Sequence, residues 1–355
     1  MPTEPPSTPP GTSPWRRLIV AAAIVLAAVA CGSDSASEAD TSAATDNSAA
    51  TDTSAATDST AATDSTAGAA TSAEAEAAAG WVAREFAEPS PDWADFGPAV
   101  NADIAIGLTA VGTEDETAAA ALDALAAKAD TLFGDPASVT PGLLGKVLLA
   151  IEVRGEDPAT FIEGHDVEAE LRALAGTDGQ FTGASVYDQA YAILGLAATD
   201  RGVPDGAAGW LVSTQCDGGD FTFSGACPAA TGEEDPDTTA IALQALLAGG
   251  ETDTAEAAAS WILDWQAEDG SISSFGAANA NSTAVAAQAL RAAGEDEAAD
   301  RAADFVAGLQ VDQPADAAGS IKFTADKAQG NAFATIQGML AFGAPALDEI
   351  EAAGS

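Results

Sequence analysis

Apolar residues recur at the spacing of α-helices from residue 81 to about residue 342, interrupted by Gly, Asp and Pro. Leu243, Leu246 and Leu247 fall at positions i, i+3 and i+4, so they share one face of a helix. No stretch alternates apolar and polar residues for long, so strands are expected only as short extensions of turns. Glycines such as Gly294 follow the periodic stretches, as expected at helix ends. The pattern predicts an all-α domain.

One phrase recurs along this helical region. It consists of an aromatic and an aliphatic residue, three more residues, a Gln, and then an Asp-Gly turn. The glutamines are Gln215, Gln266 and Gln310, spaced by 51 and then 44 residues, which is the period of a two-helix repeat. A weaker copy has Ala175 in place of the Gln. Because one repeat cannot bury its own apolar face, the repeats must stack into a shared core.

The helices that follow these turns also align. Residues 237–246 match residues 281–290, which places Asn281 at the position of Asp237. Two degenerate units, at 101–112 and 141–151, bring the number of helical hairpins to six. Five polar or aromatic residues of the aligned helices are candidates for contact with a ligand: Gln244, Gln288, Gln337, Tyr187 and Tyr191. The glutamines could equally bridge neighbouring helices in a buried network.

The chain before the repeats has a different composition. Arg16 and Arg17 precede an apolar run from 18 to 30, and small residues lead to Cys31, so residues 1–31 are expected to be a signal peptide with a lipobox-like cysteine. Residues 32–79 contain no Leu, Ile, Val, Met or aromatic residue, and they are expected to form a disordered linker. The repeat domain is expected to cover residues 80–347.

Charge and cysteine content narrow the possible partners. The net charge of −43 argues against nucleic acid and polyphosphate substrates. Export makes a disulfide between Cys216 and Cys227 plausible, since both lie in one turn. The only histidine, His165, lies in a polar loop, so neither a zinc site nor a Ser-His-Asp triad is expected. No metal or cofactor is predicted.

The repeated phrase, completed by Gly219 and Phe221, resembles the QW repeat of the prenyltransferase and squalene-cyclase superfamily. It is particularly similar to exported bacterial proteins with prenyltransferase/squalene-oxidase repeats. The resemblance covers roughly residues 80–345 and implies an α/α toroid, in which six inner helices line a central cavity and outer helices surround them. No activity follows from the fold alone.

A second resemblance concerns the start of one inner helix. Residues 235–240 resemble the acid motif D-x-D-D-T-A of class II terpene cyclases, with Thr238 in place of the fourth-position Asp. The resemblance implies that Asp237 is a general acid whose pKa is raised by burial near Asp235. The alternative is that Asp237 caps its helix. Because Asn281 at the same position could cap but could not act as an acid, capping is the favoured interpretation.

These observations leave three hypotheses about function. The leading one is a non-catalytic binding protein, anchored to the outer face of the cell membrane through a lipid on Cys31. Its ligand would be a small molecule or an envelope protein at the cavity or rim. The second is an isoprenoid-acting enzyme with Asp237 as the acid. The third is a structural envelope protein without a ligand, which predicts an occluded centre.

Overall fold

The computed structural model describes most of the chain from residue 72 onward, in the ranges 72–88, 99–135, 139–227, 234–274 and 276–351. The expected signal peptide, its Cys31 and the linker up to residue 71 lie outside the described residues. The described part is mostly helical and has almost no strand, which confirms the all-α prediction. Its two strands, β1 (Ser273–Ser274) and β2 (Ala277–Ala278), form one short antiparallel hairpin.

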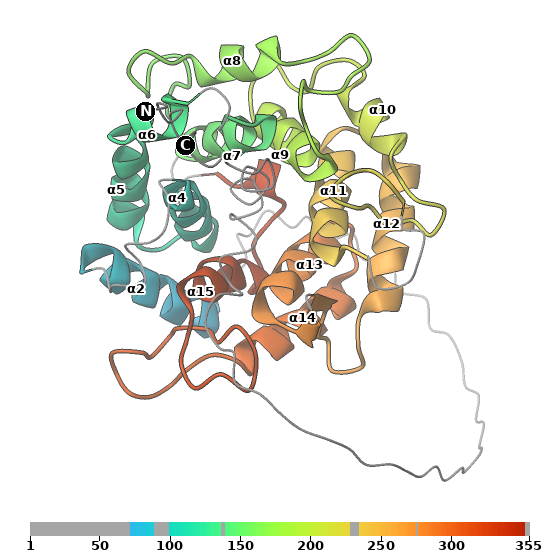
Figure 1. The fold of residues 1–355 in the computed structure, drawn as a ribbon. Helices are drawn as coiled ribbons and strands as arrows, with labels where there is room; N and C mark the ends of the chain where they lie inside the picture. The colour runs from blue at the N-terminus through green and yellow to red at the C-terminus, as the bar shows by residue number, and fades with distance from the viewer. Residues whose placement is uncertain (1–71, 89–98, 136–138, 228–233, 275, 352–355) are drawn as a thin grey trace, which may run out of the picture. The chain divides into compact units, whose positions relative to one another are not determined.

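The helices form two concentric rings (Figure 1). The inner ring contains α4 (Val100–Val111), α7 (Pro141–Glu152), α9 (Val186–Ala197), α11 (Pro236–Ala248), α13 (Ala280–Ala292) and α15 (Ala332–Gly338), the last continued by the 3-10 helix η2 (Met339–Ala341). Consecutive inner helices pack against each other, and α15 packs against α4, so the inner ring closes. The predicted ring of inner helices is therefore present.

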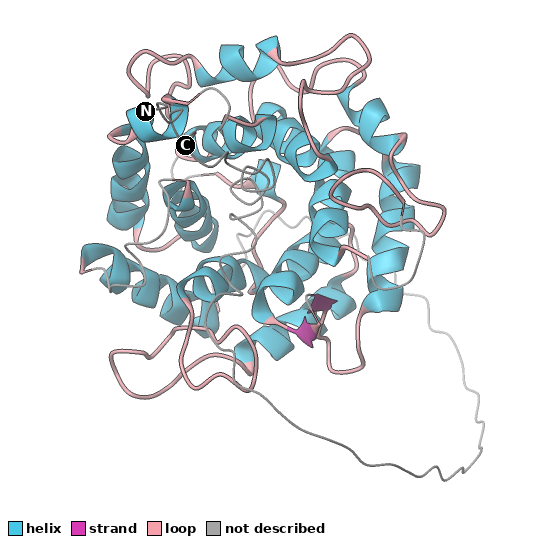
Figure 2. Cartoon of the chain, viewed as in Figure 1, coloured by secondary structure: helices cyan, strands magenta, loops and turns pink. Residues whose placement is uncertain are grey.

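The outer helices surround these inner helices (Figure 2). Five positions are taken by α5 (Asp115–Ala126) with the short α6 (Ala129–Phe133) after it, α8 (Val167–Ala173), α10 (Ala207–Val212), α12 (Thr252–Trp265) and α14 (Asp296–Ala307). The sixth position is filled by α2 (Ala73–Ala87), which packs between α15 and α4. The sixth pair consists of α15 and α2, which lie at opposite ends of the described part of the chain. This pair is therefore not the helical hairpin that the sequence predicted.

Helix α2 also corrects the expected linker boundary at residue 79. Ser72 caps the helix by accepting a hydrogen bond from the Ala75 N–H at 3.1 Å, so residues 73–79 of the expected linker are helical. Ala75, Ala78 and Ala79 are buried against the neighbouring helices. The absence of large apolar residues was misleading here, since alanine methyl groups bury apolar surface where helices approach closely.

The Gln of each repeated phrase joins its own turn to the next outer helix. Its amide donates one hydrogen bond to the carbonyl of the turn glycine and another to a carbonyl in the first turn of that helix. The acceptors are Gly219 and Thr254 for Gln215, Gly270 and Ala298 for Gln266, and Gly319 and Glu74 for Gln310, at 2.9 to 3.2 Å. The last bond reaches α2 and closes the outer ring.

The turn glycines are required at these contacts. Gly270 has φ +85°, and a Cβ there would lie 2.0 Å from the carbonyl oxygen of Arg301 in the next outer helix. Gly319 has φ +93°, and a Cβ there would lie 2.0 Å from the carbonyl oxygen of Ala77 in α2. A side chain would need both an unfavourable backbone conformation and a separation of the two segments.

The weak copy of the repeat replaces the missing amide from another position. Gln189, on α9, donates to the carbonyls of Gly179 and Ala207 at 2.9 and 3.1 Å. Its Oε1 accepts a hydrogen bond from the Phe181 N–H at 2.9 Å. The corresponding acceptors in the later units are the threonine hydroxyls Thr239, Thr283 and Thr335. Gln189 therefore performs both the Gln and the Thr functions of the other units.

Ring closure can be tested with Gln310→Ala and, as a matched control, Gln266→Ala. Each variant removes two hydrogen bonds to backbone carbonyls, so each is expected to lower the free energy of unfolding by about 1–3 kcal/mol in urea titrations. Only Gln310→Ala removes the bond to α2. Native-state hydrogen exchange should therefore become faster in Ala73–Ala87 for this variant alone, and equal protection of α2 in both variants would contradict the closure function.

Candidate functional site

The inner helices enclose a small cavity. Its volume is about 30 Å³, which accommodates about two water molecules. The apolar part of the lining comes from six side chains of the inner ring and the C-terminal segment: Ile106, Ile241, Val285, Ile336, Leu340 and Leu347. Asp103, Tyr191, Gln288 and Gln337 supply polar groups. The central cavity that the resemblance implied is thus narrow in this structure.

Two of the predicted ligand contacts hold the C-terminal segment. Gln244 is 0% exposed, and its Oε1 accepts a hydrogen bond from the Leu347 N–H at 3.1 Å. Gln288 donates from Nε2 to the Pro345 carbonyl at 2.7 Å. These amides lie in the C-terminal halves of α11 and α13, and they anchor the segment leading to the 3-10 helix η3 (Leu347–Glu349). The sequence suggested that these amides contact a ligand or bridge neighbouring helices, and neither prediction included the C-terminal segment.

The third glutamine has a partner on the neighbouring inner helix. Gln337 of α15 accepts a hydrogen bond from Nδ2 of Asn281 on α13. This is the helix-to-helix contact that the sequence left as an alternative to ligand binding. The Asn281 Oδ1 atom has no hydrogen-bond partner within the described ranges.

A charged and aromatic row crosses the first three inner helices. Lys146 of α7 forms a 2.8 Å ion pair with Asp103 of α4, and its Nζ lies 4.7 Å from the centre of the Tyr191 ring. Burial would lower the pKa of Lys146, but the charges of Asp103 and Tyr191 outweigh burial and raise it above its usual value. The ammonium is therefore a fixed cation and not a nucleophile. Sequence reasoning missed this pair, although Lys146 is the only charged residue in the first ten residues of α7.

The two predicted tyrosines continue this row on α9. The rings of Tyr187 and Tyr191 lie 5.0 Å apart. Burial, followed by the effects of Tyr191 and of the carboxylates Asp103 and Asp237, raises the pKa of Tyr187 well above its usual value. Tyr187 is therefore a neutral phenol near Asp237, and the structure brings the predicted tyrosines and the predicted acid to one end of the ring.

The favoured capping interpretation of Asp237 is wrong. The cap of α11 is Asp235, which accepts hydrogen bonds from the Thr238 N–H at 3.0 Å and the Thr238 hydroxyl at 2.6 Å. The cap of α13 is likewise Asn279, two residues before Asn281. Pro236 is compatible with this boundary, since proline is favoured at the first helical position.

The Asp237 carboxyl is consequently available for another purpose. Burial raises its pKa to about 6; the hydroxyls of Ser282 and Ser274 act against this, and the charge of Asp235 adds to it. Ser274 Oγ lies 3.4 Å from Oδ2 of Asp237. The side chain is half-buried, so it can exchange protons with water. A carboxyl group with these properties can donate or accept a proton near neutral pH.

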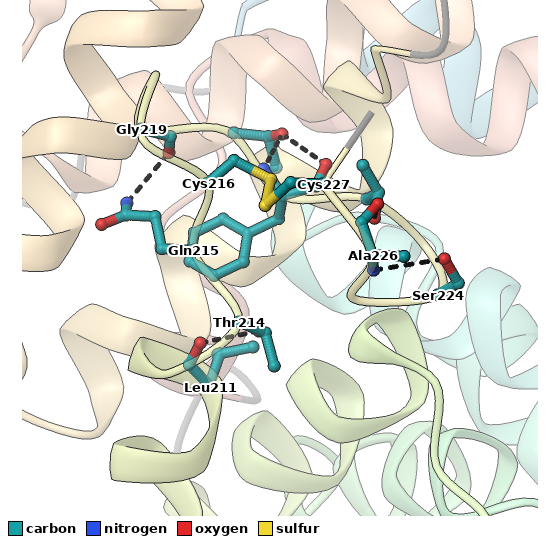
Figure 3. The surroundings of a disulfide bond; sticks show 11 residues. Leu211, Thr214, Gln215, Cys216, Gly219, Ser224, Ala226 and Cys227 are labelled. Atoms are coloured by element: carbon teal, nitrogen blue, oxygen red, sulfur yellow. Dashed lines mark hydrogen bonds between the residues drawn. A yellow bond between two sulfur atoms is a disulfide. The ribbon is translucent and has the colours of Figure 1, made fainter. Parts of the chain in front are cut away.

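The predicted disulfide between Cys216 and Cys227 is confirmed (Figure 3). It closes a loop that lies against the start of α9, where the Val186 N–H donates to the Phe223 carbonyl at 2.9 Å. The Phe223 ring is 44% exposed and its centre lies 6.3 Å from that of Tyr187. The disulfide therefore positions an aromatic side chain beside the tyrosine pair.

The remaining candidates do not form a site. His165 contacts Glu170 at 2.9 Å and stacks on Phe133, with ring centres 4.1 Å apart. Within the described ranges, no three His, Cys, Asp or Glu side chains are grouped so that they could hold a metal ion. The helices described from Ala73 onward include none with the length and apolar character needed to span a bilayer.

Comparison with known proteins found likeness in structure but none in sequence. No protein-family model matches the chain, and no curated protein is similar to it in sequence. Among solved structures, the ent-copalyl diphosphate synthase from Streptomyces platensis is similar, with a TM-score of 0.48 and 19% sequence identity. The match covers 69% of this chain and 49% of that protein, so the chain spans about half the length of this neighbour.

The disulfide loop can be tested with Cys216→Ser combined with Cys227→Ser. Because the cysteines are 11 residues apart, loss of the cross-link is expected to lower the free energy of unfolding by about 3 kcal/mol on the chain-entropy estimate. Urea titration with and without reductant measures this. Reductant should shift the wild-type midpoint to that of the variant and leave the variant unchanged. If the wild-type midpoint does not change with reductant and equals that of the variant, the disulfide does not stabilise the fold.

Proposed function

We propose that the protein is an enzyme in which Asp237 acts as a general acid on an apolar substrate of the isoprenoid class. The observation that carries this proposal is the state of the Asp237 carboxyl, which does not cap its helix and has a pKa of about 6. About a tenth of such a carboxyl is protonated at pH 7. A general acid is most effective when its pKa lies near the working pH.

The surroundings of Asp237 support this substrate class. The resemblance of residues 235–240 to the acid motif of class II terpene cyclases connects this position with protonation of a carbon–carbon double bond. Ile241 of the same helix and Val285 of the next provide apolar lining further into the ring. The neutral phenol of Tyr187 adds an aromatic side chain near the Asp237 carboxyl group.

The size of the cavity imposes a condition on the proposal. A volume of about 30 Å³ is too small for an isoprenoid chain, so the substrate must displace side chains or the segment held by Gln244 and Gln288. Leu347 lines the cavity from that segment, and its single hydrogen bond to Gln244 is a modest barrier to displacement.

A non-catalytic function is the second candidate, and the small cavity is the observation that favours it. A structural envelope protein would show such a filled centre, whereas a binding protein would use the half-buried polar groups at the rim. In either case the raised pKa of Asp237 would be a by-product of burial. Activity measurements separate these candidates from the enzyme.

We also propose that the protein acts outside the cytoplasm as a lipoprotein, based on Cys31 and the apolar run before it. The Cys216–Cys227 disulfide is compatible with this location. An anchor at Cys31 would keep the domain near a bilayer, where apolar isoprenoids dissolve.

Catalysis can be tested by deuterium incorporation. Wild-type protein in D₂O, mixed with vesicles that contain linear isoprenoid hydrocarbons and alcohols, is expected to transfer deuterium to carbon, as measured by mass spectrometry of the products. Asp237→Asn should abolish incorporation because the amide is not a proton donor at neutral pH. The control Asp264→Asn changes an exposed carboxylate and should retain full activity. Absence of incorporation by the wild type, or equal incorporation by Asp237→Asn, would refute the enzyme.

The raised pKa of Asp237 also predicts a dependence of stability on pH. Because the folded state disfavours the carboxylate, the free energy of unfolding falls as the pH rises from about 4 through about 6. Asp237→Asn lacks this charge, so above pH 7 it should be more stable than the wild type by about 1–2 kcal/mol, after allowance for partial exposure. The difference should vanish below pH 4. Urea titrations across this range measure it, and a constant difference would contradict the assignment.

A further inference from the structure

One buried amide organises the segment that faces Asp237. Asn279 is 0% exposed and precedes α13 directly. Its Oδ1 caps the helix by accepting from the Ser282 N–H at 3.0 Å. Its Nδ2 lies 3.3 Å from the carbonyl oxygens of both Ser274 and Ala277 in the β1–β2 hairpin, and 3.2 Å from Oγ of Ser282. The amide thus fixes the hairpin and the first turn of α13 together.

Both serines held in this way reach Asp237. Ser274 Oγ lies 3.4 Å from Oδ2, and the Ser282 hydroxyl acts on the same carboxyl group and lowers its pKa. Because the Asn279 Nδ2 occupies a lone pair of the Ser282 oxygen, the hydroxyl proton is directed away from the amide. Ser282 is 1% exposed, so water does not compete strongly for this proton.

We propose that the hydroxyls of Ser274 and Ser282 are positioning groups that hold the Asp237 carboxylate when its proton has left. In the step, the O–H bond of the Asp237 carboxyl breaks and its electron pair stays on the carboxylate. The π electron pair of a substrate carbon–carbon double bond forms the new C–H bond and leaves a cation on the other carbon. Two hydroxyl donors stabilise that charge. This inference rests on the proposed function, since it assigns these groups to the same proton transfer.

The other units indicate that the arrangement is not needed for capping. In α15 the cap is Asn331, which accepts from the Ala334 N–H at 3.0 Å, so the position of Ser282 is an alanine there. In α11 the corresponding Thr238 donates to its own cap, Asp235. Among the described inner helices, only in α13 does a hydroxyl at this position, that of Ser282, act on the preceding inner helix, α11.

The inference is tested by titrating the Asp237 carboxyl carbon by NMR, without any substrate. Ser282→Ala removes one donor to the charged form, so the midpoint should rise from about 6 towards about 7, and Ser274→Ala should change it in the same direction. Ser282→Thr keeps the hydroxyl and should restore the wild-type midpoint. The matched control is Ser271→Ala, whose hydroxyl contacts Asp269 at 2.7 Å and should leave Asp237 unaffected.

A further variant tests the amide. Asn279→Ser retains an oxygen for the cap but loses the Nδ2 donor, so it should raise the midpoint as Ser282→Ala does. An unshifted midpoint in Ser282→Ala, or an equal shift in Ser271→Ala, would overturn the inference whatever the turnover. A shifted midpoint in a protein that incorporates no deuterium would refute the catalysis and leave the hydroxyl contacts supported, so the two failures are distinguishable.

Discussion

The hydrogen bonds of the repeat glutamines are the constraint on which the ring depends. Each amide fixes a glycine turn against the first turn of the next outer helix, so it sets both the distance and the angle between consecutive units. Small errors in that angle would accumulate around six units and prevent α15 from meeting α4. In the unit where Ala175 replaces the glutamine, Gln189 of α9 provides the same two hydrogen bonds, so the connection is kept there as well.

The same geometry determines where polar chemistry is possible. Inner helices that start at one level bring Tyr187, Asp237 and Asn281 to the same end of the ring, while Gln244 and Gln288 lie further along, at the C-terminal segment. The three side chains at the first end are half-buried, whereas the two amides are fully buried. This division lets burial raise the pKa of a carboxyl without isolating it from water.

The sequence predicted the ring well because its period is local and repeated. It did not reveal the outer position of α2, since alanine methyl groups give no strong signal and the partner lies at the other end of the chain. The capping interpretation of Asp237 was wrong because α11 begins at Pro236, which makes Asp235 the cap. Lys146 and Asp103 belong to degenerate units, so only their spatial proximity identifies them as a pair.

Closure by α2 changes how the domain must fold. The bond from Gln310 to Glu74 joins residues 236 positions apart. An open solenoid can fold from either end, one unit after another, because each unit contacts only its neighbours. Here α2, the first helix of the described part to be synthesised, has no complete binding surface until the last repeat is made. Contacts of such large sequence separation slow folding and make it more cooperative, so loss of the final unit would expose the apolar sides of the first.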